Sequence, residues 1–173
     1  YASPGEIADD AENDKWDICN IGAEPQRAEK INFSAAYAEI QATYLVHPNS
    51  KLKNISNVDK IGNKIAVASK TAYGLWLERN ILNAELIQVE GVDSSFNVFL
   101  NDNLDALAGL RPKLIDDVKN IPGAKILEDY ITKNPNTKNV DILTQLKNIY
   151  NAIGESAKAK ALTAKLETIN QSK

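Results

Sequence analysis

Short apolar runs alternate, over the first 129 residues, with segments whose apolar positions follow helical spacing. Six of these runs have the length and composition of buried strands, and they span residues 16–21, 42–46, 64–68, 85–89, 104–108 and 124–127. Capping residues and prolines mark the starts of four helices, predicted over residues 3–13, 72–82, 96–101 and 112–120. Strands that alternate with helices are typical of βαβ units. The pattern therefore predicts an α/β fold, with a parallel-type sheet and flanking helices.

The pattern changes near residue 130. From Asp141 onwards, apolar residues follow helical spacing on two successive segments, which Gly154 separates. The first apolar stripe is Leu143, Leu146, Ile149, Tyr150 and Ile153, and the second is Ala157, Ala161, Leu162, Leu166 and Ile169. Two antiparallel helices bury such stripes against each other. We therefore divide the chain into an α/β region at 1–129, a linker at 130–139 and a helical hairpin at 140–173.

Charge follows the same division. Residues 130–173 carry 7 Lys or Arg and 3 Asp or Glu, a net charge of +4, whereas residues 1–129 carry 13 and 20, a net charge of −7. The net charge of the whole chain is −3. Because phosphate binding needs a surplus of basic residues, we expect no nucleic-acid partner.

Catalytic and metal-binding motifs are scarce. The chain has one Cys and one His, so a zinc cluster of the usual Cys/His kind is excluded, and we expect no metal and no cofactor. We recognise no nucleophile–base pair and no Gly-rich phosphate loop, so we expect the protein not to be an enzyme. The chain contains no Met, and residues 1–5 do not resemble a signal peptide, so we expect a mature or truncated product.

Several groups of residues in the α/β region resemble a known family. They are similar to motifs of the family-3 extracytoplasmic solute-binding proteins, which serve amino-acid-type ABC importers. The residues that carry the similarity are Trp16 to Ile18, Gly22, Arg27, residues 32–37 (NFSAAY), residues 44–46, residues 58–67 (VDKIGNKIAV), Thr71 and residues 104–106. They occur in the family's order and extend over residues 1–129.

The resemblance implies a function and a location. In that family, two lobes close about a hinge on a small solute, and the closed form docks on the membrane subunits of an importer. It therefore implies binding of a small carboxylate-bearing, amino-acid-like solute in the periplasm or another extracytoplasmic space. This sequence departs from the family at three positions: Glu24 replaces a Thr, Lys70 replaces a Gly, and Leu110 stands where many members have an Asp that holds the ammonium group.

The resemblance covers part of lobe 1 and most of lobe 2. We therefore expect weak or undetectable binding of small molecules by this chain alone. We also expect self-association through an exposed sheet edge near residues 16–21, because an unpaired edge strand offers hydrogen-bonding groups to another chain.

Arg27 and Thr71 are the first candidate ligand-binding residues. A guanidinium grips a carboxylate through two hydrogen bonds, and its place in the family motif implies this role for Arg27. The alternative is a surface Arg27 paired with Glu24 or Glu29. The Thr71 hydroxyl and the amides behind it suit the ligand's other oxygen. The alternative for Thr71 is an ordinary helix cap, and the two roles are compatible.

Three further residues complete the candidate ligand-binding set. Tyr73, just inside the helix after Thr71, is a candidate wall of the cleft. Asp105 and Arg111 flank the carboxyl end of the fifth predicted strand, where Arg111 is a candidate second contact for an anion. The alternative for both residues is a solvated loop charge. Among the remaining residues with reactive or aromatic side chains, we expect Trp16 and Trp76 in the core, His47 in an exposed loop and Cys19 on a buried strand as an inert thiol.

The predicted hairpin supports a different function. Leu143, Leu146, Tyr150, Gly154 and Ala159 resemble the spacing of one tetratricopeptide helix pair, within residues 140–170. A generic helical hairpin fits the same pattern, because a repeat array needs several copies. The alternative function is therefore a protein-interaction module that docks a partner on this hairpin.

Overall fold

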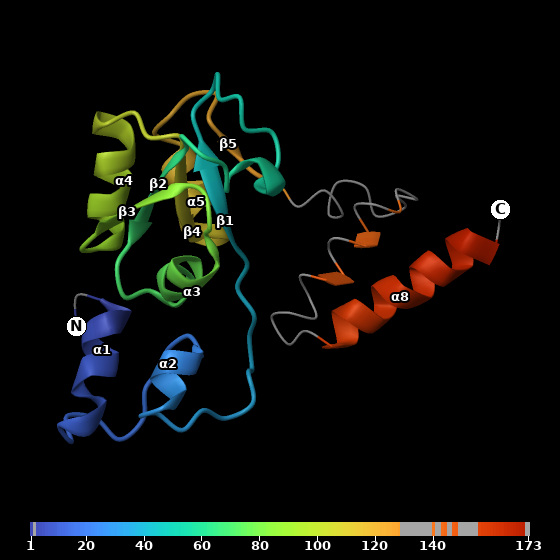
Figure 1. The fold of residues 1–173 in the computed structure, drawn as a ribbon. Helices are drawn as coiled ribbons and strands as arrows, with labels where there is room; N and C mark the ends of the chain where they lie inside the picture. Colours follow the sequence, from blue (N-terminus) through green and yellow to red (C-terminus); the bar gives the residue numbers. More distant parts are fainter. Residues whose placement is uncertain (2, 129–139, 141–142, 145–146, 149–155, 172–173) are drawn as a thin grey trace. The chain divides into compact units, whose positions relative to one another are not determined.

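The structure is a computed structural model that describes residues 1, 3–128, 140, 143–144, 147–148 and 156–171 (Figure 1). The chain forms two compact units, Tyr1–Asp129 and Tyr130–Lys173. The first unit is built around a five-stranded sheet in the order β3-β2-β4-β1-β5. Its strands are β1 (Ala42–Val46), β2 (Lys64–Ala68), β3 (Glu85–Val89), β4 (Ala106–Leu110) and β5 (Lys125–Ile126). The α/β fold class predicted from the sequence is confirmed.

The sheet is mixed rather than wholly parallel. β2 runs parallel to both β3 and β4, whereas β1 runs antiparallel to β4 and β5. A parallel connection needs a crossover segment, usually a helix. The described stretch between β1 and β2 holds only the short 3-10 helix η2 (Ile55–Asn57), and these two strands are not neighbours in the sheet. The strands predicted at 42–46, 64–68 and 85–89 are confirmed, and the fifth predicted strand begins two residues later than expected, at Ala106.

Helices cover both faces of this sheet. α3 (Ala72–Asn80) contributes Leu77 to a buried cluster that also holds Ile65 and Val67 of β2. α4 (Val92–Asn101) and α5 (Arg111–Val118) contribute Phe99 and Leu114 to a second cluster, which holds Ala66 of the same strand. Because successive residues of a strand point to opposite faces, β2 is buried on both sides.

The strand predicted at 16–21 is wrong. The part of the chain before β1 forms α1 (Pro4–Asp9), the 3-10 helix η1 (Asp10–Glu12) and α2 (Pro25–Ala28). Residues 16–21 adopt no regular structure, and the Ile18 side chain is 91% exposed. No described strand lies beside this run, and a strand without a neighbour has no ladder of hydrogen bonds to stabilise it. Trp16 instead rests on α1, where its indole Nε1 donates to the Ile7 carbonyl at 3.0 Å.

Three side chains outside the candidate set also differ from expectation. Trp76 is 39% exposed instead of filling the core. His47 is half-buried and stacks on Phe99, with ring centroids 4.2 Å apart, instead of lying in solvent. Cys19 is half-buried on an irregular segment rather than on a buried strand. Each prediction used the residue's neighbours in sequence, whereas the contact that decides its exposure comes from elsewhere in the fold.

The second unit contains α8 (Ser156–Gln171). Leu162 and Leu166 of this helix are buried with Leu143, and Val140 and Ile169 pack against them. Ala157 and Ala161 are exposed, so they do not belong to the buried stripe, whereas Ala159 is buried. The predicted linker, Gly154 and most of the first stripe lie outside the described residues, so the tetratricopeptide resemblance stays a prediction. Among the described helices, none has the length and apolar character needed to cross a membrane.

Candidate functional site

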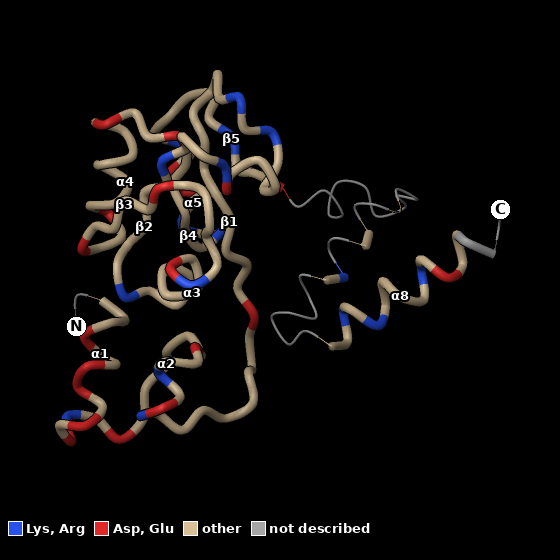
Figure 2. Tube along the Cα trace, viewed as in Figure 1, with Lys and Arg blue, Asp and Glu red and all other residues tan. Residues whose placement is uncertain are grey.

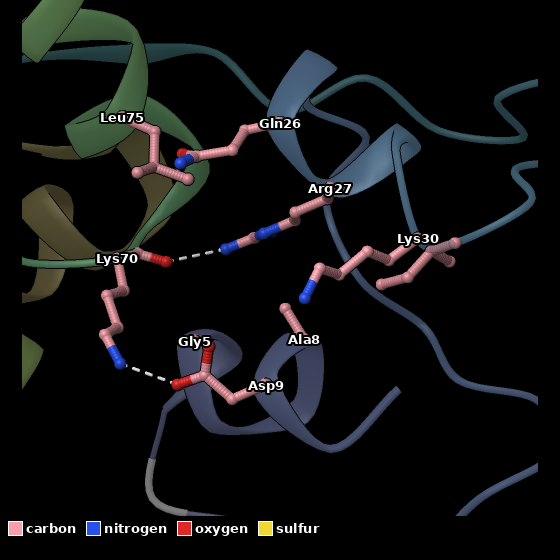
Figure 3. Close-up of a pocket in the computed structure, with 9 residues that line it drawn as sticks. Gly5, Ala8, Asp9, Gln26, Arg27, Lys30, Lys70 and Leu75 are labelled. Atoms are coloured by element: carbon pink, nitrogen blue, oxygen red, sulfur yellow. Dashed lines mark hydrogen bonds and ion pairs between the residues drawn. The ribbon is translucent and has the colours of Figure 1, made fainter. Parts of the chain in front are cut away.

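Arg27 is anchored by the short helix α2. Glu24 caps this helix, since its carboxylate accepts a hydrogen bond from the Gln26 amide at 2.8 Å. The Arg27 side chain is only 5% exposed. Its Nη1 donates to the Gly22 carbonyl at 2.9 Å and its Nη2 donates to the Lys70 carbonyl at 2.7 Å (Figure 3). The interpretation of Arg27 as a surface residue is therefore wrong.

The Arg27 guanidinium is a buried charge. Among the described residues, no carboxylate forms an ion pair with it, because Glu24 pairs with Arg79 of α3 instead. Desolvation by burial lowers the pKa of Arg27 from its ordinary value, an effect that the negative charge of Glu24 opposes. A buried charge is costly unless it is paired. An anionic ligand would provide that partner.

A cavity of about 300 Å³ opens beside this guanidinium, and we call it the Arg27 pocket. Its volume lies at the lower end of the range of about 300–1,000 Å³ that is usual for small-molecule sites. Residues from α1, from α2 and the turn after it, from the corner between β2 and α3, and from α3 line it (Figure 3). The lining residues are Gly5, Ala8 and Asp9 of α1, Gln26 and Arg27 of α2, Lys30 and Ile31 after it, Lys70 between β2 and α3, and Leu75 of α3.

The lining of the Arg27 pocket is mainly cationic. It contains three basic residues, Arg27, Lys30 and Lys70, and one acidic residue, Asp9. Lys70 Nζ lies 2.6 Å from Asp9 Oδ2, and Lys30 pairs with Glu12 of η1. In each pair the hydrogen bond to the carboxylate, and then its charge, raises the pKa of the lysine, so both lysines stay protonated. Figure 2 shows how acidic residues follow one another along α1 and η1.

The corner between β2 and α3 has an unusual backbone. Lys70 adopts a left-handed conformation, with φ at +56°, which glycine adopts at little cost and other residues at more. A glycine at position 70 would therefore adopt this conformation at less cost than Lys70 does. Gly5 of α1 packs directly on this corner, because a Cβ at position 5 would lie 2.5 Å from the Lys70 Cβ. The close approach of α1 to Lys70 therefore requires glycine at position 5.

Thr71 caps α3, as its alternative interpretation predicts. Its side chain is buried, its hydroxyl accepts from the Gly74 amide at 3.0 Å, and the same hydroxyl donates to the Ala68 carbonyl at 2.8 Å. Tyr73 is half-buried and packs against the core cluster on the α3 face of the sheet, and burial raises the pKa of its phenol. Neither residue lines the Arg27 pocket.

The structure separates Asp105 from the other candidates. Asp105 precedes β4, and its carboxylate accepts from the Lys64 amide at 2.8 Å, at the beginning of β2. Lys70 and Thr71 follow the end of β2, so Asp105 lies at the opposite edge of the sheet. Arg111 follows the end of β4, at the same edge as Thr71, but its guanidinium pairs with Glu128 and does not line the pocket. Of the five candidates, the pocket therefore contains Arg27 alone.

The sequence analysis missed the lysines that accompany Arg27. Lys30 follows Arg27 by three residues, a spacing that places two side chains on the same side of a helical turn, so this signal was present. Lys70 was noted only as a departure from a glycine. The contribution of α1 could not be found in this way, because it depends on a contact between residues far apart in the sequence. In the part of the chain that the structure describes, no three Asp, Glu, His or Cys residues are arranged to hold a metal ion.

Solved structures with the same fold are solute-binding proteins. The substrate-binding protein of an amino acid ABC transporter has a TM-score of 0.62 and 18% identity, over 94% of this chain and 75% of that one. An amino acid ABC transporter substrate-binding protein from Streptococcus pneumoniae, bound to L-arginine, has a TM-score of 0.61 and 16% identity, over 94% and 72%. The cysteine-binding protein from Campylobacter jejuni has a TM-score of 0.61 and 20% identity, over 71% and 50%.

These similarities show a common fold and nothing further. No family model matches the sequence, and no curated protein matches it closely enough to count as a relative. The chain spans about half the length of the cysteine-binding protein and of the arginine-binding protein from T. maritima, at 50% and 54%. The first unit thus has a periplasmic-binding-protein-like fold, formed by a mixed five-stranded sheet with helices on both faces.

Proposed function

We propose that this chain binds a small carboxylate-bearing solute in the Arg27 pocket. The observation that carries the proposal is Arg27. This residue is only 5% exposed, its guanidinium forms no ion pair among the described residues, and it borders a cavity of about 300 Å³. A guanidinium still has free N–H groups after donating two hydrogen bonds, since it carries five. A carboxylate in the cavity would accept two of them and neutralise the charge.

The position of Arg27 also suits a ligand that joins two parts of the unit. Arg27 belongs to α2, whereas the carbonyl that accepts from it belongs to Lys70, next to the first turn of α3. A ligand between them would contact both segments, so it would favour the conformation in which they lie together.

The fold of the matched proteins supports a proposal about the wider role. Several of them are substrate-binding proteins of amino acid ABC transporters. On this basis we propose that the chain is part of an extracytoplasmic or periplasmic solute-binding protein, whose partners are the membrane subunits of an ABC importer. It would then act as a binding protein and not as an enzyme.

Isothermal titration calorimetry against a panel of amino acids and small organic acids tests the proposal, after a thermal-shift screen that selects candidates. Replacing Arg27 with Ala should weaken the binding of any acid found by about 2–5 kcal/mol, as expected when one partner of a desolvated charge pair is removed. Arg27→Lys should recover only part of the affinity, since a lysine lacks the planar fork.

Arg111→Ala is the matched control. It removes an arginine from the same unit, and that arginine forms an ion pair outside the pocket. We expect it to leave the affinity unchanged. Equal affinity of Arg27→Ala and the unmodified protein for every acid that binds would refute the site.

A further inference from the structure

The charges around the Arg27 pocket exceed what one carboxylate needs. Three cationic side chains line it, and Arg27 alone is buried deeply enough to require a partner. Lys30 and Lys70 are 52% and 62% exposed, and their carboxylate partners Glu12 and Asp9 are 62% and 61% exposed. Exposed ion pairs of this kind contribute little to stability and are screened by salt. Lys30 can therefore exchange Glu12, which does not line the pocket, for an anionic group of a ligand, while Lys70 keeps Asp9 as its partner.

The lining offers no place for a ligand's ammonium group. An ammonium needs a carboxylate or several carbonyl groups nearby. Asp9 is the only acidic residue of the lining, and it is already within 2.6 Å of Lys70 Nζ. The Lys70 carbonyl, which lies inside the pocket in Figure 3, already accepts from Arg27. A zwitterion would thus bring its positive group among three cations.

The remaining lining is apolar. Ala8, Ile31 and Leu75 come from three different segments and supply hydrocarbon surface. Gln26 is the one neutral polar side chain of the lining. A ligand that fits this arrangement has anionic ends and a short hydrocarbon centre.

We infer that the ligand of the Arg27 pocket is a short aliphatic dicarboxylate without an ammonium group. One carboxylate pairs with the buried Arg27 guanidinium, and the other pairs with Lys30, beside an apolar wall. This inference rests on the proposed function and narrows its substrate class.

Calorimetry with three closely matched acids tests the inference. Glutarate carries two carboxylates, its monoamide has the same shape with one charge fewer, and L-glutamate adds an ammonium group to glutarate. Glutarate should bind about tenfold more tightly than either of the others, because a charge-assisted hydrogen bond is lost in the first comparison and a repelled cation is added in the second. Equal binding of glutarate and its monoamide, or tighter binding of L-glutamate, would overturn the inference.

Variants then identify the second anion site. Lys30→Gln should abolish the preference for glutarate over its monoamide, while both compounds still bind through Arg27. Lys119→Gln is the matched control, because Lys119 forms an equally exposed ion pair with Asp116, away from the pocket. It should keep the full preference. A Lys30→Gln variant that retains the preference would also overturn the inference.

The two proposals fail in different ways. If no acid binds, or if Arg27→Ala binds all acids as well as the unmodified protein does, the pocket is not the site and both proposals are wrong. If binding depends on Arg27 but L-glutamate or the monoamide is preferred, the proposed function stands and only the dicarboxylate inference is wrong.

Discussion

Two regions of the first unit are held together by different forces. Residues 42–128, which we call the sheet region, bury apolar side chains on both faces of the sheet, and many of them have no exposed surface. In the N-terminal segment, residues 3–41, all of which the structure describes, Ile31 is the only buried hydrophobic side chain. The other buried side chains of this segment that make specific contacts are Glu24 and Arg27, and both are charged.

Polar contacts connect the N-terminal segment to the sheet region. Arg27 donates to the Lys70 carbonyl, Glu24 pairs with Arg79, and Asp9 pairs with Lys70. Apolar burial is roughly proportional to area and does not depend on direction, whereas each of these contacts depends on a particular pair of atoms. The comparison teaches that the sheet region is the stable scaffold, and that the N-terminal segment is placed partly by groups that also line the pocket.

The largest loss of stability is expected when a substitution creates a cavity in the sheet region. Phe99→Ala removes a ring with no exposed surface from the cluster between the sheet and α4, so the free energy of unfolding should fall by about 3–5 kcal/mol. Phe96→Ala, at the half-buried edge of the same cluster, should cost about half as much. Urea unfolding followed by circular dichroism measures both. A loss below about 1 kcal/mol for Phe99→Ala would contradict the tight packing of this cluster.

Removing either partner of the ion pair between the two regions should lower the free energy of unfolding by a smaller amount. The Glu24 side chain is 3% exposed and that of Arg79 is 42% exposed. Arg79→Ala leaves a buried carboxylate without its partner, and should cost about 2–3 kcal/mol, whereas Glu24→Gln leaves a cation that water can reach and should cost about half of that.

Amide hydrogen exchange identifies the part of the chain that loses stability in these two variants. In both variants, exchange should accelerate in residues 24–31 and remain slow in β2 and β4. Equal acceleration in these strands would mean that the segment and the sheet unfold as one unit.

The smallest effect is expected from the backbone of Lys70. Lys70→Gly relieves the left-handed conformation but loses the ion pair with Asp9, whereas Lys70→Ala loses the ion pair and keeps the unfavourable φ. The glycine variant should therefore be more stable than the alanine variant by about 1 kcal/mol. Thermal unfolding of both variants, compared with the unmodified protein, measures this difference. An alanine variant as stable as the glycine variant would show that the corner is not strained.

The same comparison explains what the sequence could predict. The strands of the sheet region were predicted because their apolar runs follow from burial on both faces, as in residues 64–68. The run at residues 16–21 also contains apolar residues, although Asp17 and Asn20 interrupt them, and it forms no strand because no described strand lies beside it. Pairing is a property of the whole fold and leaves no mark on the run itself.

The candidate site was predicted only in part, for a related reason. Arg27 was found because its family-like motif is local in sequence. Lys70 and Asp9 lie 61 positions apart, and only the fold brings them together. Asp105 was placed beside the ligand because it lies near a strand, but the strand's direction puts it at the other edge of the sheet.

The central claim is that the Arg27 guanidinium meets the ligand, and nuclear magnetic resonance of arginine side chains tests it most directly. The chain has three arginines, Arg27, Arg79 and Arg111, so its guanidinium spectrum is simple, and the Arg27→Ala variant assigns the signal of interest. On titration with glutarate, we predict that the Nε and Nη signals of Arg27 shift and saturate, while those of Arg79 and Arg111 stay in place. An Arg27 signal that does not move while calorimetry detects binding would contradict the account.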